Sequence, residues 1–341
     1  MSYRGYLVRR TLSIIPVFVG VTLLIFLLAR VIPGAPARQA LGPRASDEAV
    51  QQLREQLGLD EPIWVQYINY VEGLIQGDMG QSLTTNQNVA TDIVEFFPAT
   101  FELTTIAMLL AIVFGIPLGV YAGQNKDQFG DNVSRAFAFT AVSLPRFWSG
   151  IILQLAIAFQ LGWLPSTGRL AEGVPVPETV TGLLLVDSLL AANFEAFFSA
   201  GRHLILPAVT LSLAPMADIA RLTRSSFIEE FNRDYVEGFR THGLPERLIA
   251  YKYVLKKSFA STLTIIGLDY GILLGAAFLV EIVFSWPGMA RYGVRAILET
   301  DINAIVGVTL IISLGFLLAN LVVDILYGYF DPRVRLRGEG E

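Results

Sequence analysis

Long apolar runs, each about twenty residues and almost free of charge, restrict the fold of this sequence more than any other feature. A helix of that length crosses the hydrocarbon core of a bilayer with every backbone hydrogen bond satisfied internally. Composition agrees, since 53% of the 341 residues are hydrophobic and 16% are charged, against about 25% in soluble domains. We therefore expect an all-α integral membrane protein that crosses the bilayer several times.

Six runs have the length and composition of transmembrane helices. They are residues 11–32, 101–121, 137–161, 204–220, 263–284 and 304–327. A further apolar stretch, 181–192, is too short and carries Asp187, so we expect it to be interfacial or re-entrant. The predicted organisation is a cytoplasmic N-terminus with the first helix (1–32), an external helical loop (33–100), a five-helix core (101–330) and a cytoplasmic tail (331–341).

Lysine and arginine are concentrated on one side of these six spans, which predicts the orientation. Eight of them lie in the segment 221–257, and others precede the first span and follow the last. The loops on the other side, 33–100, 162–203 and 285–303, hold fifteen Asp and Glu, seven Arg and no Lys. Both termini are therefore expected to be cytoplasmic, in a multi-pass protein of the cell membrane.

The first external loop is too long to lack secondary structure. Ser46 is a suitable N-cap for a helix over 46–57, and residues 59–73 continue with a second helical pattern.

Signatures of catalysis are missing from the sequence. Cysteine is absent and there are only two histidines, so neither a thiolate nucleophile nor a Cys or His metal site is expected. No phosphate-binding loop, H-E-x-x-H or G-x-S-x-G string occurs. If the protein uses nucleotide energy, another polypeptide must hydrolyse the nucleotide.

Four carboxylates fall within or at the ends of the predicted spans: Asp218, Asp269, Glu281 and Asp324. Each costs about 2.5–3.5 kcal/mol at a helix centre and therefore needs a partner or a wet cavity. They could line a substrate pathway or proton relay, or form structural hydrogen bonds. We favour the structural role for Glu281 and Asp324, near span ends, and leave Asp218 and Asp269 open.

A polar segment at 234–261, between two apolar spans, has the pattern of a helical hairpin. Asp234 and Glu237 have the spacing of a capping box, Gly243 can take the left-handed conformation that ends a helix, and Pro245 can open the next. A rigid hairpin on the wet side of a membrane protein is a docking element for a soluble partner. The alternative is an ordinary loop between spans.

Several motifs occur in order along the chain and together resemble one family. They include Y-L-V-R-R-T-L-S-I-I-P at the start, S-L-P-R-F-W in the third span, G-W-L-P-S-T-G after it, V-E-I-V-F-S-W-P-G-M in the fifth span, and D-I-L-Y-G-Y-F-D-P-R-V-R at the end. On these motifs the chain resembles permease subunits of binding-protein-dependent ABC importers of the dipeptide, oligopeptide and nickel type, specifically the first permease of the pair.

This resemblance implies a non-enzymatic subunit of six transmembrane helices that moves peptides or a similar small solute. It implies four further subunits around it: a second, homologous permease, two ABC ATPases that use ATP and Mg, and an external solute-binding protein. No cofactor bound by this chain, no metal and no nucleic acid is implied, and the surroundings are membrane lipid.

The family signature Glu-Ala-Ala, three residues, then Gly aligns here with Glu237-Gly238-Phe239 and Gly243. The resemblance therefore assigns ATPase coupling to eight residues: Tyr235, Glu237, Gly238, Phe239, Arg240, His242, Gly243 and Leu244. We expect Phe239 to be an exposed docking aromatic, and Gly238 to loosen the helix by about 1 kcal/mol relative to Ala. We place the pathway along the third to fifth spans, touching Ser143, Asp218 and Asp269.

Three other functions compete with this one. A proton-coupled peptide carrier would use Asp218, Asp269 or Asp324 as relay but would not need the hairpin. An intramembrane aspartyl protease would need two facing Asp residues, and the surroundings of Asp269 and Asp324 do not fit that chemistry. A nucleotide-independent channel is the third.

The net charge of −5 is low for a protein of this orientation. At 1 M salt, charges are screened beyond about 3 Å, and a surface rich in carboxylates stays hydrated under these conditions. We therefore expect that the protein comes from a salt-loving organism. The alternative is an acidic docking face for a basic binding protein.

Overall fold

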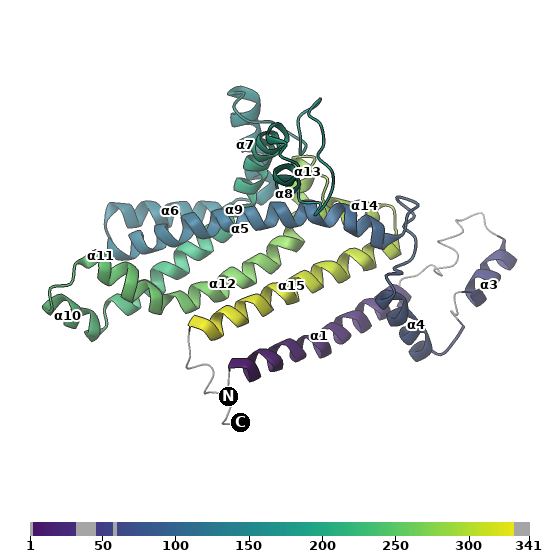
Figure 1. Ribbon diagram of the computed structural model, residues 1–341, viewed down its shortest axis with the longest axis horizontal. Helices are drawn as coiled ribbons and strands as arrows, with labels where there is room; N and C mark the ends of the chain where they lie inside the picture. Colours follow the sequence, from purple (N-terminus) through teal and green to yellow (C-terminus); the bar gives the residue numbers. More distant parts are fainter. Residues whose placement is uncertain (1–2, 32–45, 57–59, 331–341) are drawn as a thin grey trace.

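The computed structural model describes residues 3–31, 46–56 and 60–330. Within these ranges the chain is almost entirely helical, and its one β-type contact is an isolated bridge between Gln81 and Asn88. Five helical segments are long and apolar enough to cross a membrane: α1 (Tyr3–Val31), α5 (Val89–Gln124), α9 (Phe194–Phe231), the segment Glu246–Ala276 that ends in α12 (Leu255–Ala276), and α15 (Ile302–Phe330). They run along the long axis of the molecule (Figure 1).

The third predicted span is not one straight helix. It divides into α6 (Phe129–Ser143), α7 (Arg146–Leu153) and the π-helical η1 (Gln154–Gln160), and the two halves are bent by 106°. Pro145 is the cause, because a proline disfavours the helical conformation of the residue before it, and Leu144 is extended (φ −85°, ψ 128°). The described residues therefore contain six candidate spans if the bent pair counts as one.

Three glycines bring α5 and α9 into close contact. Gly115, Gly119 and Gly123 recur every four residues on one face of α5, and a Cβ built on Gly119 would lie 2.6 Å from the carbonyl oxygen of Ala220. Such small-residue repeats let helix backbones approach in membranes. From this pair the packing continues through α12 to α15 and from α15 to α1.

A hairpin closes one end of the bundle. It consists of α10 (Asp234–Thr241), α11 (Glu246–Leu248) and the π-helical η2 (Ile249–Val254), which leads into α12. The first residues of α1 and the last of α15 point toward the same half of the molecule (Figure 1).

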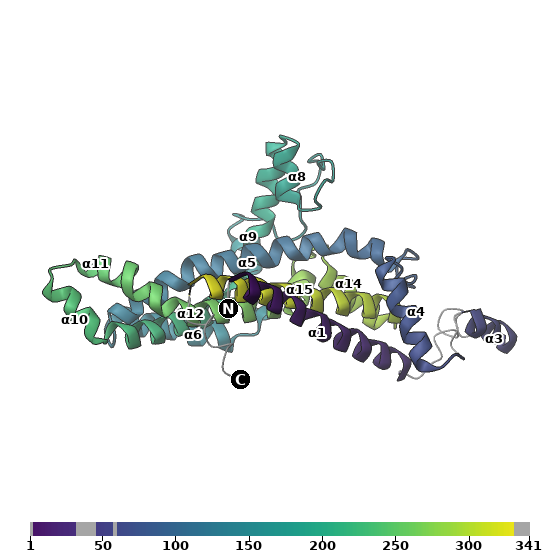
Figure 2. The same cartoon turned by 60° about the horizontal axis from the view of Figure 1, so that its bottom comes forward.

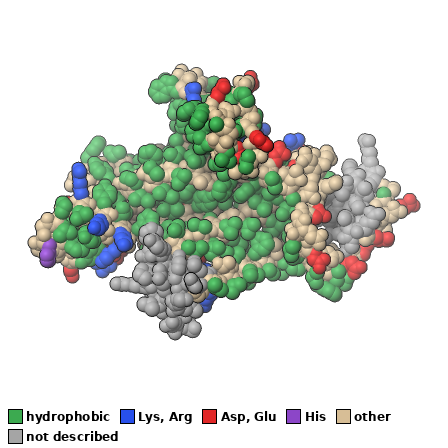
Figure 3. Space-filling model, in the orientation of Figure 1, with side chains coloured by type: hydrophobic (Ala, Val, Ile, Leu, Met, Phe, Trp, Pro, Cys, Tyr) green, Lys and Arg blue, Asp and Glu red, His purple; other side chains and the backbone are tan. Residues whose placement is uncertain are grey.

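The opposite end carries α3 (Asp47–Gln56), α4 (Ile63–Ile75) and α14 (Met289–Leu298). Ser46 Oγ accepts a hydrogen bond from the amide of Ala49 (3.2 Å), which confirms Ser46 as the N-cap of α3. Residues 57–59, which the predicted helices were to include, lie outside the described part. Figure 3 shows Lys and Arg around the hairpin and most Asp and Glu of this face toward the opposite end.

A lateral projection leaves the side of the bundle. It contains α7, η1 and α8 (Leu184–Leu190), and both ribbon views show the projection leaving the bundle of long helices (Figures 1 and 2), while α8 itself packs against α9. With seven residues α8 cannot cross a membrane, as expected for the stretch 181–192. The short α13 (Phe278–Val283) packs against α7 at the base of this projection.

Candidate functional site

The hairpin is anchored to the bundle by its own small apolar core. Val236 of α10 and Ile249 of η2 are fully buried, together with Val120 of α5 and Phe227 of α9. Since these residues come from four helical segments, the hairpin is packed directly against α5 and α9.

Gly243 is the residue that turns the hairpin. Its φ is +74°, in the left-handed region predicted for it. The amide of Leu244 donates to Phe239 O (3.1 Å) and that of Gly243 to Arg240 O (2.9 Å). These two bonds form a Schellman motif, which satisfies the last carbonyls of α10.

The predicted capping box is wrong. The N-cap of α10 is Arg233, in extended conformation and without a side-chain capping bond, and Asp234 is already the first helical residue. The N-cap is therefore one residue earlier than the predicted Asp234. The side chain of Arg233 caps no amide and donates to Glu229 (2.9 Å). Asp234 and Glu237 still lie in the first turn, where negative charge is favoured by the helix dipole.

The prediction that Phe239 is an exposed aromatic is also wrong, while its docking role stays a prediction. The side chain is half-buried, with its ring centroid 4.4 Å from that of Tyr253 and 5.8 Å from that of Tyr235. Lys257 Nζ lies 3.7 Å from the centroid of the Tyr235 ring. Burial, and then the hydrogen bond to Glu230, raise the pKa of Tyr235 to about 12. Phe239 therefore stabilises the hairpin from within.

The exposed members of the predicted coupling set are Glu237, Arg240, His242 and Gly243. Arg240 Nε donates to Glu246 (2.7 Å) across the turn, and this hydrogen bond raises the pKa of Arg240. Gly238 is half-buried, yet a Cβ built on it would meet nothing within 4 Å. The outer face of α10 is therefore open at Gly238.

The structure brings two of the three predicted pathway residues near each other. Ser143 lines a cavity of about 240 Å³ between α5, α6 and α9, which Asp218 and Asp269 do not line. Asp218 and Asp269, on α9 and α12, lie near enough to interact electrostatically with each other and with Arg146 of α7. Asp218 also pairs with the exposed Arg221 (2.8 Å).

The other two carboxylates have the structural roles that we favoured. Glu281 is fully buried and accepts hydrogen bonds from Thr100 Oγ1 (2.5 Å) and the amide of Arg291 (2.7 Å). Asp324 pairs with Arg10 (3.2 Å), which joins α15 to α1.

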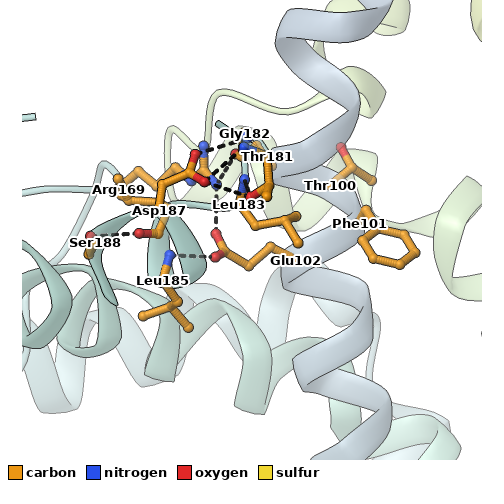
Figure 4. Close-up of polar contacts among 12 residues, drawn as sticks. Thr100, Phe101, Glu102, Arg169, Thr181, Gly182, Leu183, Leu185, Asp187 and Ser188 are labelled. Carbon is orange, nitrogen blue, oxygen red and sulfur yellow. Dashed lines mark hydrogen bonds and ion pairs between the residues drawn. The ribbon is translucent and has the colours of Figure 1, made fainter. Parts of the chain in front are cut away.

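Two buried ion pairs are missing from the sequence predictions. Asp131 of α6 is fully buried and accepts from both Nε and Nη2 of Arg224 (2.6 Å each), which fixes α6 to α9. Glu102 of α5 accepts from Arg169 (2.6 Å) and from the amide of Leu185 (2.8 Å), so the lateral projection is attached to α5 (Figure 4). A carboxylate at the start of an apolar span was the available signal for Glu102.

Asp187 organises the turn before α8 (Figure 4). It accepts from Thr181 N (2.8 Å) and Oγ1 (2.7 Å) and from Gly182 N (2.9 Å). Burial alone would raise the pKa of this carboxyl, but the hydrogen bonds to its charged form outweigh burial and lower the pKa below the ordinary value.

Comparison with known proteins decides the family. Residues 115–336 match the family described as binding-protein-dependent transport system inner membrane component, and residues 3–104 match its N-terminal companion. The chain belongs to this transport family. Family members are permease subunits of ABC importers and not enzymes, and ATP hydrolysis takes place in separate subunits. The proton-coupled carrier is therefore the weaker reading.

Permeases of known transport systems match this chain over its full length. A dipeptide transport system permease of Alkalihalophilus pseudofirmus is 41% identical over 97% of this chain and 99% of its own length. A probable D,D-dipeptide transport system permease of Escherichia coli K12 is 41% identical over 100% of both chains. A glutathione transport system permease of Escherichia coli is 34% identical over 98% of this chain and 99% of its own.

Proposed function

We propose that this permease imports dipeptides or closely similar short peptides. The observation that carries the proposal is the similarity over full length to permeases whose names specify dipeptides and glutathione, all of them short peptides. The importer further comprises a second, homologous permease, two ABC ATPases and an external solute-binding protein.

The hairpin end and both termini face the cytoplasm in this proposal. The Lys and Arg that gather around the hairpin (Figure 3) support that orientation, because cytoplasmic loops carry an excess of positive charge. The carboxylate-rich loops, with α3, α4 and α14, then face the binding protein.

Coupling follows from how the hairpin is built. The outer face of α10, from Glu237 to Gly243, sits in a groove of an ATPase subunit, as amphipathic helices do in helix-in-groove complexes. When ATP brings the ATPases together, the hairpin moves as a unit because Val236 and Ile249 are packed against α5 and α9. The spans then shift between two packings that open the pathway to either side.

The pathway in this proposal runs along α6, α7, α9 and α12, at the interface with the second permease. Ser143, Asp218 and Asp269 come from three of these helices. The bend at Pro145 supports a pathway here, since irregular backbone at membrane depth is tolerated where it lines protein or a watery cavity.

Gly238→Leu tests the coupling. The Cβ of the new side chain meets nothing within 4 Å in this chain, and the substitution removes a helix-interior glycine that costs about 1 kcal/mol, so the subunit itself should gain stability. A seated ATPase would meet the added bulk. We expect co-purification of the ATPases with the permease, and ATP-driven peptide uptake by the complete complex, to fall at least tenfold.

Gly201→Leu is the matched control, because Gly201 is also helical with nothing within 4 Å but lies near the start of α9, far along the chain from the hairpin. It should leave ATPase binding unchanged. Wild-type binding and uptake by Gly238→Leu would show that this face of α10 is not the docking surface.

A further inference from the structure

Three charged side chains from three helices converge beside the bend in the third span. Arg146 is the first residue of α7, Asp218 lies in α9 and Asp269 in α12, and the two carboxylates interact electrostatically with the guanidinium. They are separated by 51 or more positions in sequence, so only the packing of α7 and α12 against α9 brings them together.

Asp269 is a buried carboxylate with an unused acceptor. It is 9% exposed, and its Oδ2 has no hydrogen-bond partner in the described part of the chain. Burying a carboxylate oxygen without a hydrogen-bond partner costs free energy. The structural carboxylates of this chain avoid that cost, because Asp131, Glu281 and Glu102 each accept two or more hydrogen bonds.

Arg146 is the complementary group. It is half-buried, and within the described residues it makes no hydrogen bond or ion pair. Arg54, Arg169 and Arg224, the other half-buried arginines of the described part, are all paired with carboxylates. Arg146 therefore has five donors that no described residue uses, near enough to two acidic side chains to interact electrostatically, and one of these, Asp218, already pairs with Arg221.

We propose that Arg146 and Asp269, with Asp218 beside them, form a transient site for the two charged ends of a zwitterionic peptide as it passes through the permease. The guanidinium of Arg146 binds the peptide carboxylate, for which its planar fork is suited, and Asp269 accepts from the peptide ammonium. This site rests on the proposed peptide import and names the substrate feature that the membrane part recognises.

The separation of the charges favours such a ligand over a simple ion pair. The ammonium and carboxylate of a dipeptide are at most about 7 Å apart. A site that binds both groups therefore needs two opposite charges that are separated by a similar distance and do not pair with each other. No ion pair within 4 Å joins Arg146 to either carboxylate among the described residues. Because Arg146 follows the bend at Pro145, a shift of α7 against α12 would part the two groups and release the peptide.

The test uses the complete importer in proteoliposomes with saturating, fully loaded binding protein, so that the affinity of the binding protein does not limit uptake. Uptake of Ala-Ala is compared with that of Ala-Ala-amide, which lacks the carboxylate, and N-acetyl-Ala-Ala, which lacks the ammonium; loading of each is measured beforehand. Arg146→Gln should slow Ala-Ala about tenfold or more, as for loss of charge-assisted hydrogen bonds, and Ala-Ala-amide less than about twofold. Asp269→Asn should likewise slow uptake of Ala-Ala about tenfold or more, and uptake of N-acetyl-Ala-Ala less than about twofold.

Arg146→Lys should restore part of the uptake of Ala-Ala, and Asp324→Asn, at a carboxylate paired with Arg10, should slow all three peptides equally or not at all. Equal slowing of all peptides by Arg146→Gln and Asp269→Asn would overturn the site and leave peptide import intact. Absence of any peptide uptake by the wild-type complex would overturn the proposed function instead.

A second measurement uses the lack of native cysteine. Asp269→Cys should react with the cationic reagent 2-aminoethyl methanethiosulfonate in the ATP-bound complex, and Ala-Ala presented by the binding protein should slow that reaction severalfold. No reaction, or a reaction that Ala-Ala does not slow, counts against the site even if the uptake variants assemble poorly.

Discussion

Gly119→Ala adds a single methyl group at the tightest point between α5 and α9. Its Cβ would lie 2.6 Å from Ala220 O, 2.7 Å from Thr223 Cβ and 3.1 Å from Arg224 N. Two of these three atoms are backbone, so no side-chain rotation relieves the contact. The helices must separate by a substantial fraction of an ångström.

The magnitude follows from two opposing effects. Overpacking of a well-packed core costs about 1–3 kcal/mol, and the rigid neighbours place this site near the upper end. Alanine regains about 1 kcal/mol of helix propensity relative to glycine. The net loss is about 2 kcal/mol, which lowers Tm by roughly 3 °C, because an unfolding entropy of about 2.1 cal/mol/K per residue over 341 residues makes each kcal/mol worth about 1.4 °C.

Thermal unfolding of the purified protein in detergent measures the effect, with Gly201→Ala as control. Gly201 is a glycine of α9 with nothing within 4 Å, so alanine there should leave Tm unchanged or raise it. The two substitutions are chemically identical and differ only in what the methyl group meets. A Tm for Gly119→Ala at or above that of the wild type would refute the close-packing argument.

Three further outcomes are expected. Gly243→Val forces a β-branched residue into φ +74°, a strain of about 1–3 kcal/mol, so ATP-driven uptake should fall while membrane abundance stays constant; uptake equal to wild type would contradict the turn's role. Glu102→Gln leaves the charge of Arg169 without its partner and should destabilise the protein by about 3–5 kcal/mol. As a control in the same unfolding assay, Arg295→Gln, which breaks an exposed pair with Glu299, should destabilise it by less than about 1 kcal/mol. If the carboxylate-rich loops reflect a salt-loving source, Tm should rise from low salt to molar KCl, and a flat or falling Tm would favour an acidic docking face.

Local signals in the sequence were sufficient for the helices and the turn. Apolar length alone located the five long spans, because a lipid-exposed helix needs about twenty apolar residues whatever it packs against. The left-handed conformation of Gly243 was predictable for a similar reason, since a glycine just after a helical pattern commonly takes the positive φ that ends the helix. Such features depend on the few residues nearest in sequence.

Features that depend on a second helix were missed or misread. The sequence around Phe239 gives no sign that Tyr253, on the other arm of the hairpin, covers its ring. Glu102 and Arg169 are 67 positions apart and pair only because the lateral projection folds back to α5. The bend at Pro145 was visible as a proline, but a proline in a membrane helix can kink it slightly or break it, and the packing of α7 on α9 and α13 selects the 106° bend.

The same packing explains how a signal at the hairpin could reach the peptide site. The hairpin core contains Val120 and Phe227, one at each side of the glycine-mediated contact between α5 and α9, so those two helices should move together. Asp131 and Arg224 extend that rigid unit to α6, and therefore to the bend that precedes Arg146. Asp269 lies on α12, which continues directly from the hairpin's second arm. Arg146 thus follows the unit formed by α5, α6 and α9, and Asp269 belongs to α12. In this proposal a tilt of the hairpin moves α12 relative to that unit and changes the distance between Arg146 and Asp269, while each helix keeps its shape.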